Sequence, residues 1–234
     1  MICISNLQNF HNFFTYIFCI FFLHRVNHNI QLPESICDHM YRMAIASILL
    51  NYNSDPSNSP PALNISRCLL LSLVHDIGES LTGDIVPMDP MGKTEKQRRE
   101  KLAMEQIRDT LLPNPAGEEI YQAWEEYEQQ QTAEAKVVKD LDRLEMILQA
   151  YEYESKQLIN LSTFYESVRG KIRHPIIQKW AEEIEQRRLN LSIDNELSFQ
   201  KKVKQVFENY KLPLITLGTL FTVTFTYYIK SHKS

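Results

Sequence analysis

The sequence is poor in glycine, in cysteine motifs and in net charge, and each shortage argues against a class of protein. Only six of the 234 residues are glycine, and the overall balance of residues favours helices over sheet. The four cysteines have neither a CxxC pair nor zinc-type spacing, so we expect free thiols in a reducing compartment. A net charge of −4 gives no broad footprint for a nucleic-acid polymer. The chain is long enough for one sizeable core, and we expect a cytoplasmic, all-α protein.

Two apolar runs lie near the ends of the chain. Residues 13–23 are about as long as a signal-peptide core, but no Lys or Arg precedes them. Residues 212–229 reach the minimum length of a membrane span, and the lysines before them would keep the main domain on the cytoplasmic side. We therefore expect an atypical apolar segment at 1–26, a main domain at 27–192, and a C-terminal extension at 193–234 that is a candidate membrane anchor.

Between these ends the spacing of apolar residues predicts a series of helices. The first four are expected at 33–52, from Asn64 or Ser66 to Gly83, at 94–112 and at 118–131. A long helix at 132–156 follows, and 162–191 contains a short helix and a longer one. Pro33-Glu34 is the candidate opening of the first helix, with Ser35 as an alternative cap, and Thr132 is the candidate cap of the long helix. Six residues are expected to form the apolar stripe of the first helix: Ile36, Met40, Met43, Ile45, Ile48 and Leu49.

The stretch Leu69–Asp84, LLLSLVHDIGESLTGD, joins a buried helix to groups that carry charge. Apolar residues crowd its first half, so His75 and Asp76 fall at the end of a helix that is buried almost all round. Glu79 follows His75 by one turn, so the two side chains can lie on the same face of the helix and contact the same ion. Imidazole and carboxylate groups are costly in such a place unless they are paired or bind a metal ion.

This stretch, taken alone, allows two interpretations. A His-Asp pair alone more often marks a capped helix end, with a core histidine whose hydrogen bonds are made within the protein. Imidazole nitrogen and carboxylate oxygen together, however, suit a divalent transition metal. Gly83 can end the helix and let the loop bring Asp84 back toward the same point.

Two further candidate ligands favour the metal site. His39 lies on the apolar stripe of the first helix, where a lone histidine is usually a core residue. Asp142 lies on the inner face of the long helix, with Glu145 or Met146 one turn further on, whereas Asp140 is expected to point toward solvent. A buried carboxylate that faces a buried His-Asp pair is costly as a purely structural feature, but it is a good metal ligand.

The ordered motifs of the chain resemble those of the HD-domain superfamily, and within it the HD-domain 5′-deoxynucleotidases. The segments PES-x-x-DHMYRMA, LVHD-x-x-E-x-x-TGDI, AEAK-x-VK-x-LD and QAYEYE carry the resemblance, over about residues 27–190. The resemblance implies an HD-domain helical bundle with a metal site in its core. It also implies Mn²⁺, Co²⁺ or Mg²⁺ as the metal and a homodimer as the assembly.

The resemblance further implies a role for each candidate residue. Four residues match the family's metal ligands: His39, His75, Asp76 and Asp142. Glu79 matches the acidic residue that positions or activates the attacking water, and Asp84 matches the TGD aspartate near the sugar. The sequence departs from the family just before PES, where an Arg-x-x-Trp-like segment is usual. Only Arg25 offers a fixed positive charge there, so it is the candidate phosphate contact.

We therefore expect a metal-dependent phosphomonoesterase that converts deoxyribonucleoside 5′-monophosphates to deoxyribonucleoside and phosphate. The alternative enzyme is another HD phosphohydrolase with a cyclic nucleotide or a guanosine polyphosphate as substrate. An alternative of a different class is a catalytically weak HD scaffold tethered to a membrane through its tail.

Overall fold

The fold is built from helices. The computed structural model describes residues 30–52, 63–83, 92–112, 115–157 and 159–209, and within these ranges it contains α-helices, one π-helical turn and no strand. The expected all-α class is therefore confirmed. Residues 13–23 and 212–229, the two apolar runs, lie outside the described residues, as do Arg25 and Asp84. In the described part of the chain, no helix has both the length and the apolar character needed to cross a membrane.

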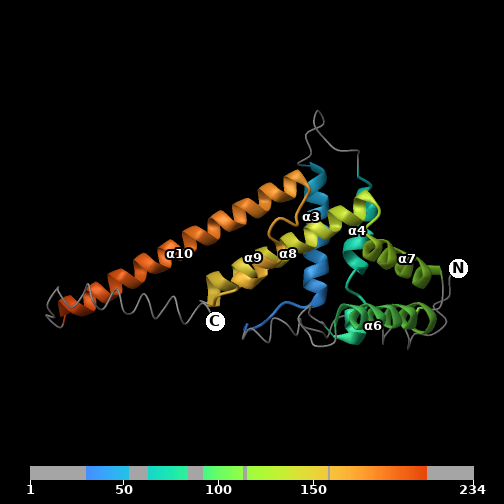
Figure 1. The fold of residues 1–234 in the computed structure, drawn as a ribbon, viewed down its shortest axis with the longest axis horizontal. Coiled ribbons are helices and arrows are strands. Elements are labelled where there is room, and N and C mark those ends of the chain that lie inside the picture. Colours follow the sequence, from blue (N-terminus) through green and yellow to red (C-terminus); the bar gives the residue numbers. More distant parts are fainter. Residues whose placement is uncertain (1–29, 53–62, 84–91, 113–114, 158, 210–234) are drawn as a thin grey trace.

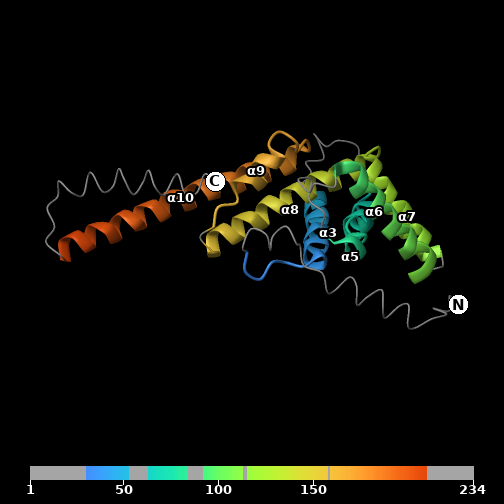
Figure 2. The same cartoon turned by 60° about the horizontal axis from the view of Figure 1, so that its bottom comes forward.

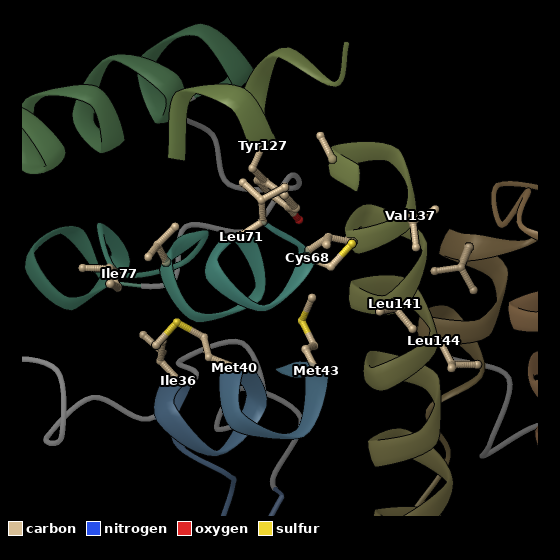
Figure 3. Packing of buried hydrophobic residues seen from close by; sticks show 14 of the residues in the cluster. Ile36, Met40, Met43, Cys68, Leu71, Ile77, Tyr127, Val137, Leu141 and Leu144 are labelled. Carbon is tan, nitrogen blue, oxygen red and sulfur yellow. The ribbon is translucent and has the colours of Figure 1, made fainter. Parts of the chain in front are cut away.

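Three helices form the centre of the bundle. Helix α3 (Ile36–Tyr52) packs on α4 (Ile65–Val74), and both pack on the long helix α8 (Ala133–Gln157). Figure 1 shows α3 and α8 crossing at this contact, with α4 beside them. Figure 3 shows Met43 of α3, Cys68 and Leu71 of α4, and Leu141 of α8 gathered in the space between the helices. Full burial of one such side chain contributes about 1.5–3 kcal/mol, so this contact is the main reason that the three helices hold a fixed arrangement.

The other helices surround this centre. Helix α7 (Pro115–Gln129) packs on α4 and α8, and α5 (Glu79–Thr82) packs on α6 (Gly92–Gln106). Helix α9 (Ser162–Val168) packs on α8, as does α10 (Pro175–Asn209). Figures 1 and 2 show α10 extending far beyond the rest of the bundle. The domain boundary expected after residue 192 falls within this helix and stays a prediction.

The caps predicted for three helices are present. The Oγ of Ser35, the alternative cap of α3, accepts a hydrogen bond from Asp38 N at 3.1 Å, and Asp38 Oδ2 accepts one from Ser35 N at 2.9 Å. The Asn64 side chain accepts a hydrogen bond from Arg67 N at the start of α4. Thr132 Oγ1 accepts one from Ala135 N at 3.1 Å at the start of α8.

The expected apolar stripe of α3 is correct in its first half and wrong in its second. Ile36, Met40 and Met43 are buried, whereas Ile45, Ile48 and Leu49 are exposed. Each residue of a helix is turned by about 100° from the one before it, so positions nine, twelve and thirteen after Ile36 lie on other faces. Leu50, which returns to the face of Ile36, is buried in their place.

The predicted helix up to Gly83 is interrupted. Helix α4 ends at Val74, and α5 begins at Glu79 and ends at Thr82. The intervening turn is tighter than an α-helix, because Glu79 N donates to Asp76 O at 3.0 Å. A Cβ on Gly78 would lie 3.3 Å from the Met104 side chain, so glycine here lets α6 approach closely. Gly83 has φ 75° and ends α5 as predicted.

The segment between α6 and α7 also differs from the prediction. Helix α6 continues into a π-helical turn, η1 (Ile107–Leu111), and α7 begins at Pro115, before the expected start at residue 118. A Cβ on Gly117 would lie 2.0 Å from the carbonyl oxygen of Leu112. A residue without a side chain is therefore required where α7 begins.

Asp140 is buried, so the expectation that it points toward solvent is wrong. Its Oδ2 accepts hydrogen bonds from the backbone N–H groups of Arg173 and His174, at 2.7 and 2.8 Å. Its Oδ1 accepts one from Arg143 at 2.9 Å. Asp140 does lie on the side of α8 away from Asp142, but the residues that lead into α10 cover that side. Asp140 is thus a structural residue that fixes the start of α10.

Candidate metal centre

Four of the candidate residues meet where α3, α4 and α8 pack together. His39 Nε2 lies 3.4 Å from Asp142 Oδ1 and 3.7 Å from Asp76 Oδ2, and His75 Nε2 lies 3.1 Å from Asp76 Oδ2. One ligand atom each of His39, His75 and Asp142 lies within 4.8 Å of the others. His39 comes from α3, His75 and Asp76 from the turn directly after α4, and Asp142 from α8. The structure therefore brings together residues from three separate segments.

The site is buried on the imidazole side and open on the carboxylate side. The side chains of His39 and His75 are 3% and 0% exposed, whereas those of Asp76 and Asp142 are 21% and 22% exposed. Water and a solute can therefore reach the cluster past the two carboxylates.

Hydrogen bonds fix the face that each imidazole presents. His75 Nδ1 lies 3.0 Å from the carbonyl oxygen of Ser72, which can only accept, so Nδ1 carries the hydrogen. His39 Nδ1 likewise lies 2.5 Å from Glu145 Oε2. Both histidines thus turn Nε2 toward the carboxylates of Asp76 and Asp142. Within the described residues His75 Nε2 makes no hydrogen bond.

The carboxylates around His39 favour a positive charge at this point of the site. Burial disfavours the charged form of His39, but Glu145 and Asp142 outweigh that effect and raise the pKa of His39 to about 10. Burial would raise the pKa of Asp142, yet Lys139 and the two histidines hold it well below the usual range. Two imidazole nitrogens and two ionised carboxylates are a donor set that fits a divalent cation.

Asp142 presents one particular oxygen to the cluster. Its Oδ2 accepts hydrogen bonds from Tyr127 Oη and from Lys139 Nζ, each at 2.8 Å. Lys139 Nζ also donates to Tyr127 Oη at 2.9 Å. With Oδ2 occupied by these two donors, Oδ1 is the oxygen that faces His39.

Glu79, the candidate acid or base, is buried at the start of α5 and close to a lysine. Lys96 Nζ of α6 lies 3.7 Å from Glu79 Oε1 and 3.2 Å from Glu100 Oε1. Burial would lower the pKa of Lys96, but Glu79 and Glu100, with a smaller effect of Asp76, raise it. Lys96 therefore lies within electrostatic range of both Glu79 and the cluster.

Four residues around the site were not identified from the sequence as functional. Glu145 is only an alternative to Met146 on the inner face, and no motif singles out Tyr127 or Lys96. Lys139 belongs to the motif AEAK-x-VK-x-LD, but the sequence assigns it no role. A charged residue at a buried helical position, as at Glu145, is the signal that could have found one of them.

The fold and the cluster together define a class: a helical domain with a mixed imidazole and carboxylate site for a divalent metal ion in its core. A family model described as HD domain matches residues 23–185, and the chain belongs to that family.

Curated relatives of the chain share this region. The 5′-deoxynucleotidase HDDC2 of Homo sapiens is 47% identical over 165 residues, which are 70% of this chain and 76% of the relative. The 5′-deoxynucleotidase hdd1 of Schizosaccharomyces pombe is 43% identical over 167 residues, which are 69% of this chain and 79% of the relative. A solved structure of a conserved hypothetical protein from Pyrococcus furiosus superposes with a TM-score of 0.61 at 26% identity, covering 77% of this chain and 99% of the other.

Proposed function

We propose that the chain is a metal-dependent 5′-deoxynucleotidase, which hydrolyses deoxyribonucleoside 5′-monophosphates to deoxyribonucleoside and phosphate. The observation that carries the proposal is the meeting of His39, His75, Asp76 and Asp142, from three segments, at one partly open point. The names of the relatives, which share more than two thirds of their length with this chain, supply the substrate class.

In this proposal the four residues hold one divalent ion, Mn²⁺, Co²⁺ or Mg²⁺. The ion, when bound, neutralises charge on the phosphate and makes water more acidic. His39 and His75 contribute Nε2, and Asp142 contributes the oxygen that Tyr127 and Lys139 leave turned inward.

The proton and the substrate are handled by other residues. Glu79 takes a proton from the water that attacks phosphorus, the bond between phosphorus and the 5′ oxygen breaks, and the 5′ oxygen takes up a proton to leave as the hydroxyl of the deoxyribonucleoside. Lys96 lies beside Glu79 and favours its ionised form. By resemblance, Asp84 contacts the sugar and Arg25 the phosphate. A homodimer in the cytoplasm is the expected state of the enzyme.

Phosphate release by the purified chain tests the proposal. The chain is stripped of metal with a chelator, reloaded with Mn²⁺, Co²⁺ or Mg²⁺, and offered deoxyribonucleoside and ribonucleoside 5′-monophosphates, cyclic nucleotides and guanosine polyphosphates. We expect metal-dependent release from the deoxyribonucleoside 5′-monophosphates above the others. Preference for a cyclic or polyphosphate substrate would point to the other HD phosphohydrolase, and metal binding without turnover would point to the scaffold. Sedimentation of the same sample tests the homodimer.

A further inference from the structure

Glu145 contacts both the candidate metal ligand His39 and the guanidinium of Arg42. It lies on α8 one turn after Asp142, and its side chain is only 4% exposed. Its Oε2 lies 2.5 Å from His39 Nδ1, and its Oε1 lies 2.9 Å from Arg42 Nε. The carboxylate therefore spans the space between two side chains of α3.

Arg42 is itself held in place by α8. Its Nη2 lies 3.0 Å from Glu152 Oε1, and its Nη1 donates to Gln149. Because Arg42 has these further partners, the oxygen that Glu145 turns toward Arg42 is fixed, and so is the oxygen that it turns toward His39.

A second cation site is the competing explanation of the same residues. Glu34, His39 and Glu145 are all buried, and one ligand atom of each lies within 4.8 Å of the others. The guanidinium of Arg42 already supplies a positive charge to Glu145, however, and His39 Nδ1 is at hydrogen-bonding distance from it. These contacts favour a hydrogen bond to His39 over a second metal ion.

We propose that Glu145 is a positioning residue for the metal centre. By accepting the Nδ1–H of His39, it makes Nε2 the nitrogen that gives up its hydrogen when a metal ion binds, and it fixes the direction in which Nε2 points. Arg42 supports this by holding the other oxygen of the carboxylate. The inference rests on the proposed function, since it assigns His39 to the metal ion.

A glutamine at this position should present the wrong atom to His39. In the Glu145→Gln variant the guanidinium of Arg42 attracts the amide oxygen, so the amide NH₂ faces His39 Nδ1. That NH₂ can only donate, so Nδ1 must accept and Nε2 must carry the hydrogen. Replacing Arg42 as well removes the constraint, and the amide oxygen can then turn to His39.

The test is a titration of the metal-free full chain with Co²⁺, read from the affinity and from the visible absorption spectrum of the bound ion. For Glu145→Gln we expect binding about 10- to 100-fold weaker than wild type, the usual effect of losing such a partner, and an altered spectrum. The double variant Arg42→Met with Glu145→Gln should recover a clear part of that loss. Wild-type affinity and spectrum in Glu145→Gln, or a double variant no better than the single one, would overturn the proposal.

Glu152→Gln is the matched control. It changes a carboxylate on the same helix that contacts the same Arg42, but the contact to His39 stays with Glu145. We expect unchanged Co²⁺ affinity, and an equal loss in both variants would assign the effect to Arg42 and refute the role of Glu145. Two Co²⁺ ions per chain, with the second lost in Glu145→Gln, would support the second cation site instead.

The outcomes separate this inference from the proposed function. A wild-type chain that binds no divalent ion would contradict both, whereas a wild-type chain that binds Co²⁺ beside an equally competent Glu145→Gln chain would contradict only the role of Glu145. If Glu145→Gln does not fold, as judged by circular dichroism, the wild-type chain loaded with Zn²⁺ still tests the proposal. Nitrogen-15 NMR should then find the hydrogen of His39 on Nδ1, and a hydrogen on Nε2 would refute the proposal.

Discussion

Lys96 Nζ lies 3.7 Å from Glu79 Oε1, so the proposed general base on α5 has a counter-charge on a different helix, α6. The side chain of Lys96 is 27% exposed and that of Glu79 is 9% exposed. The contact links a lysine in a run that looks like a solvated helix face to the part of the site where a proton must move.

Glu79→Ala should slow catalysis and leave metal binding intact. Loss of a positioned acid or base usually costs on the order of 10²–10⁴ in turnover. The measurements are kcat with a deoxyribonucleoside 5′-monophosphate and the affinity for Mn²⁺. Asp76→Ala is the comparison, because it should lose metal together with activity. Near-normal turnover in Glu79→Ala would show that another group takes the proton of the water.

Lys96→Met should lower kcat by about tenfold, a loss equivalent to about 1.4 kcal/mol of transition-state stabilisation. Without the lysine, Glu79 loses a cationic neighbour that favours its ionised form. Lys101→Met, on the exposed side of the same helix, is the matched control and should keep wild-type kcat. Equal kcat in the two variants would mean that Lys96 has no part in the reaction.

Metal affinity should rise with pH. In the metal-free chain the pKa of His39 is raised to about 10, so below that pH the imidazole holds a proton that a metal ion must displace. One displaced proton predicts an affinity for Mn²⁺ that grows about tenfold per pH unit between about pH 6 and 8. Calorimetry in buffers of different ionisation enthalpy should count about one proton released per ion. A dissociation constant that does not change over this range would contradict the prediction.

Asp140→Ala should destabilise the fold without weakening the metal site. The substitution leaves two backbone N–H groups and Arg143 without their acceptor, so we expect a loss of about 3–5 kcal/mol in the free energy of unfolding. Urea denaturation measures the loss, and titration with Mn²⁺ of the folded variant should give wild-type affinity. Asp142→Ala, two residues further along α8, should weaken metal binding without destabilising the fold. A stable Asp140→Ala chain that has lost its metal would show that the two roles are exchanged.

The helices were accessible to sequence reasoning because they follow from local signals, and the set of four candidate ligands was accessible because the ordered motifs resemble those of a family. Caps such as Thr132 act within one turn, and a buried histidine such as His39 or His75 stands out among apolar neighbours. The outer positions of α3 and the burial of Asp140 were not accessible in this way. Whether a helix face is covered depends on which other helix packs there, and apolar spacing on one helix does not carry that information.

The partners of the site residues were hidden for the same reason. Lys96 reaches Glu79 from another helix, and Arg42 of α3 reaches Glu145 of α8. An isolated charged residue on an amphipathic helix looks the same whether it faces water or an ion-pair partner. Only the packing of the helices separates the two cases.

The order of the ligands along the chain has a consequence for the protein during its synthesis. His39, His75 and Asp76 leave the ribosome well before Asp142, and the candidate metal site lacks its third side until α8 has emerged and packed against α3 and α4. A nascent chain that ends before α8 therefore has no complete site with which to capture an ion. Metal loading becomes a late event in the life of each molecule, and a loaded ion marks a chain whose bundle is already assembled.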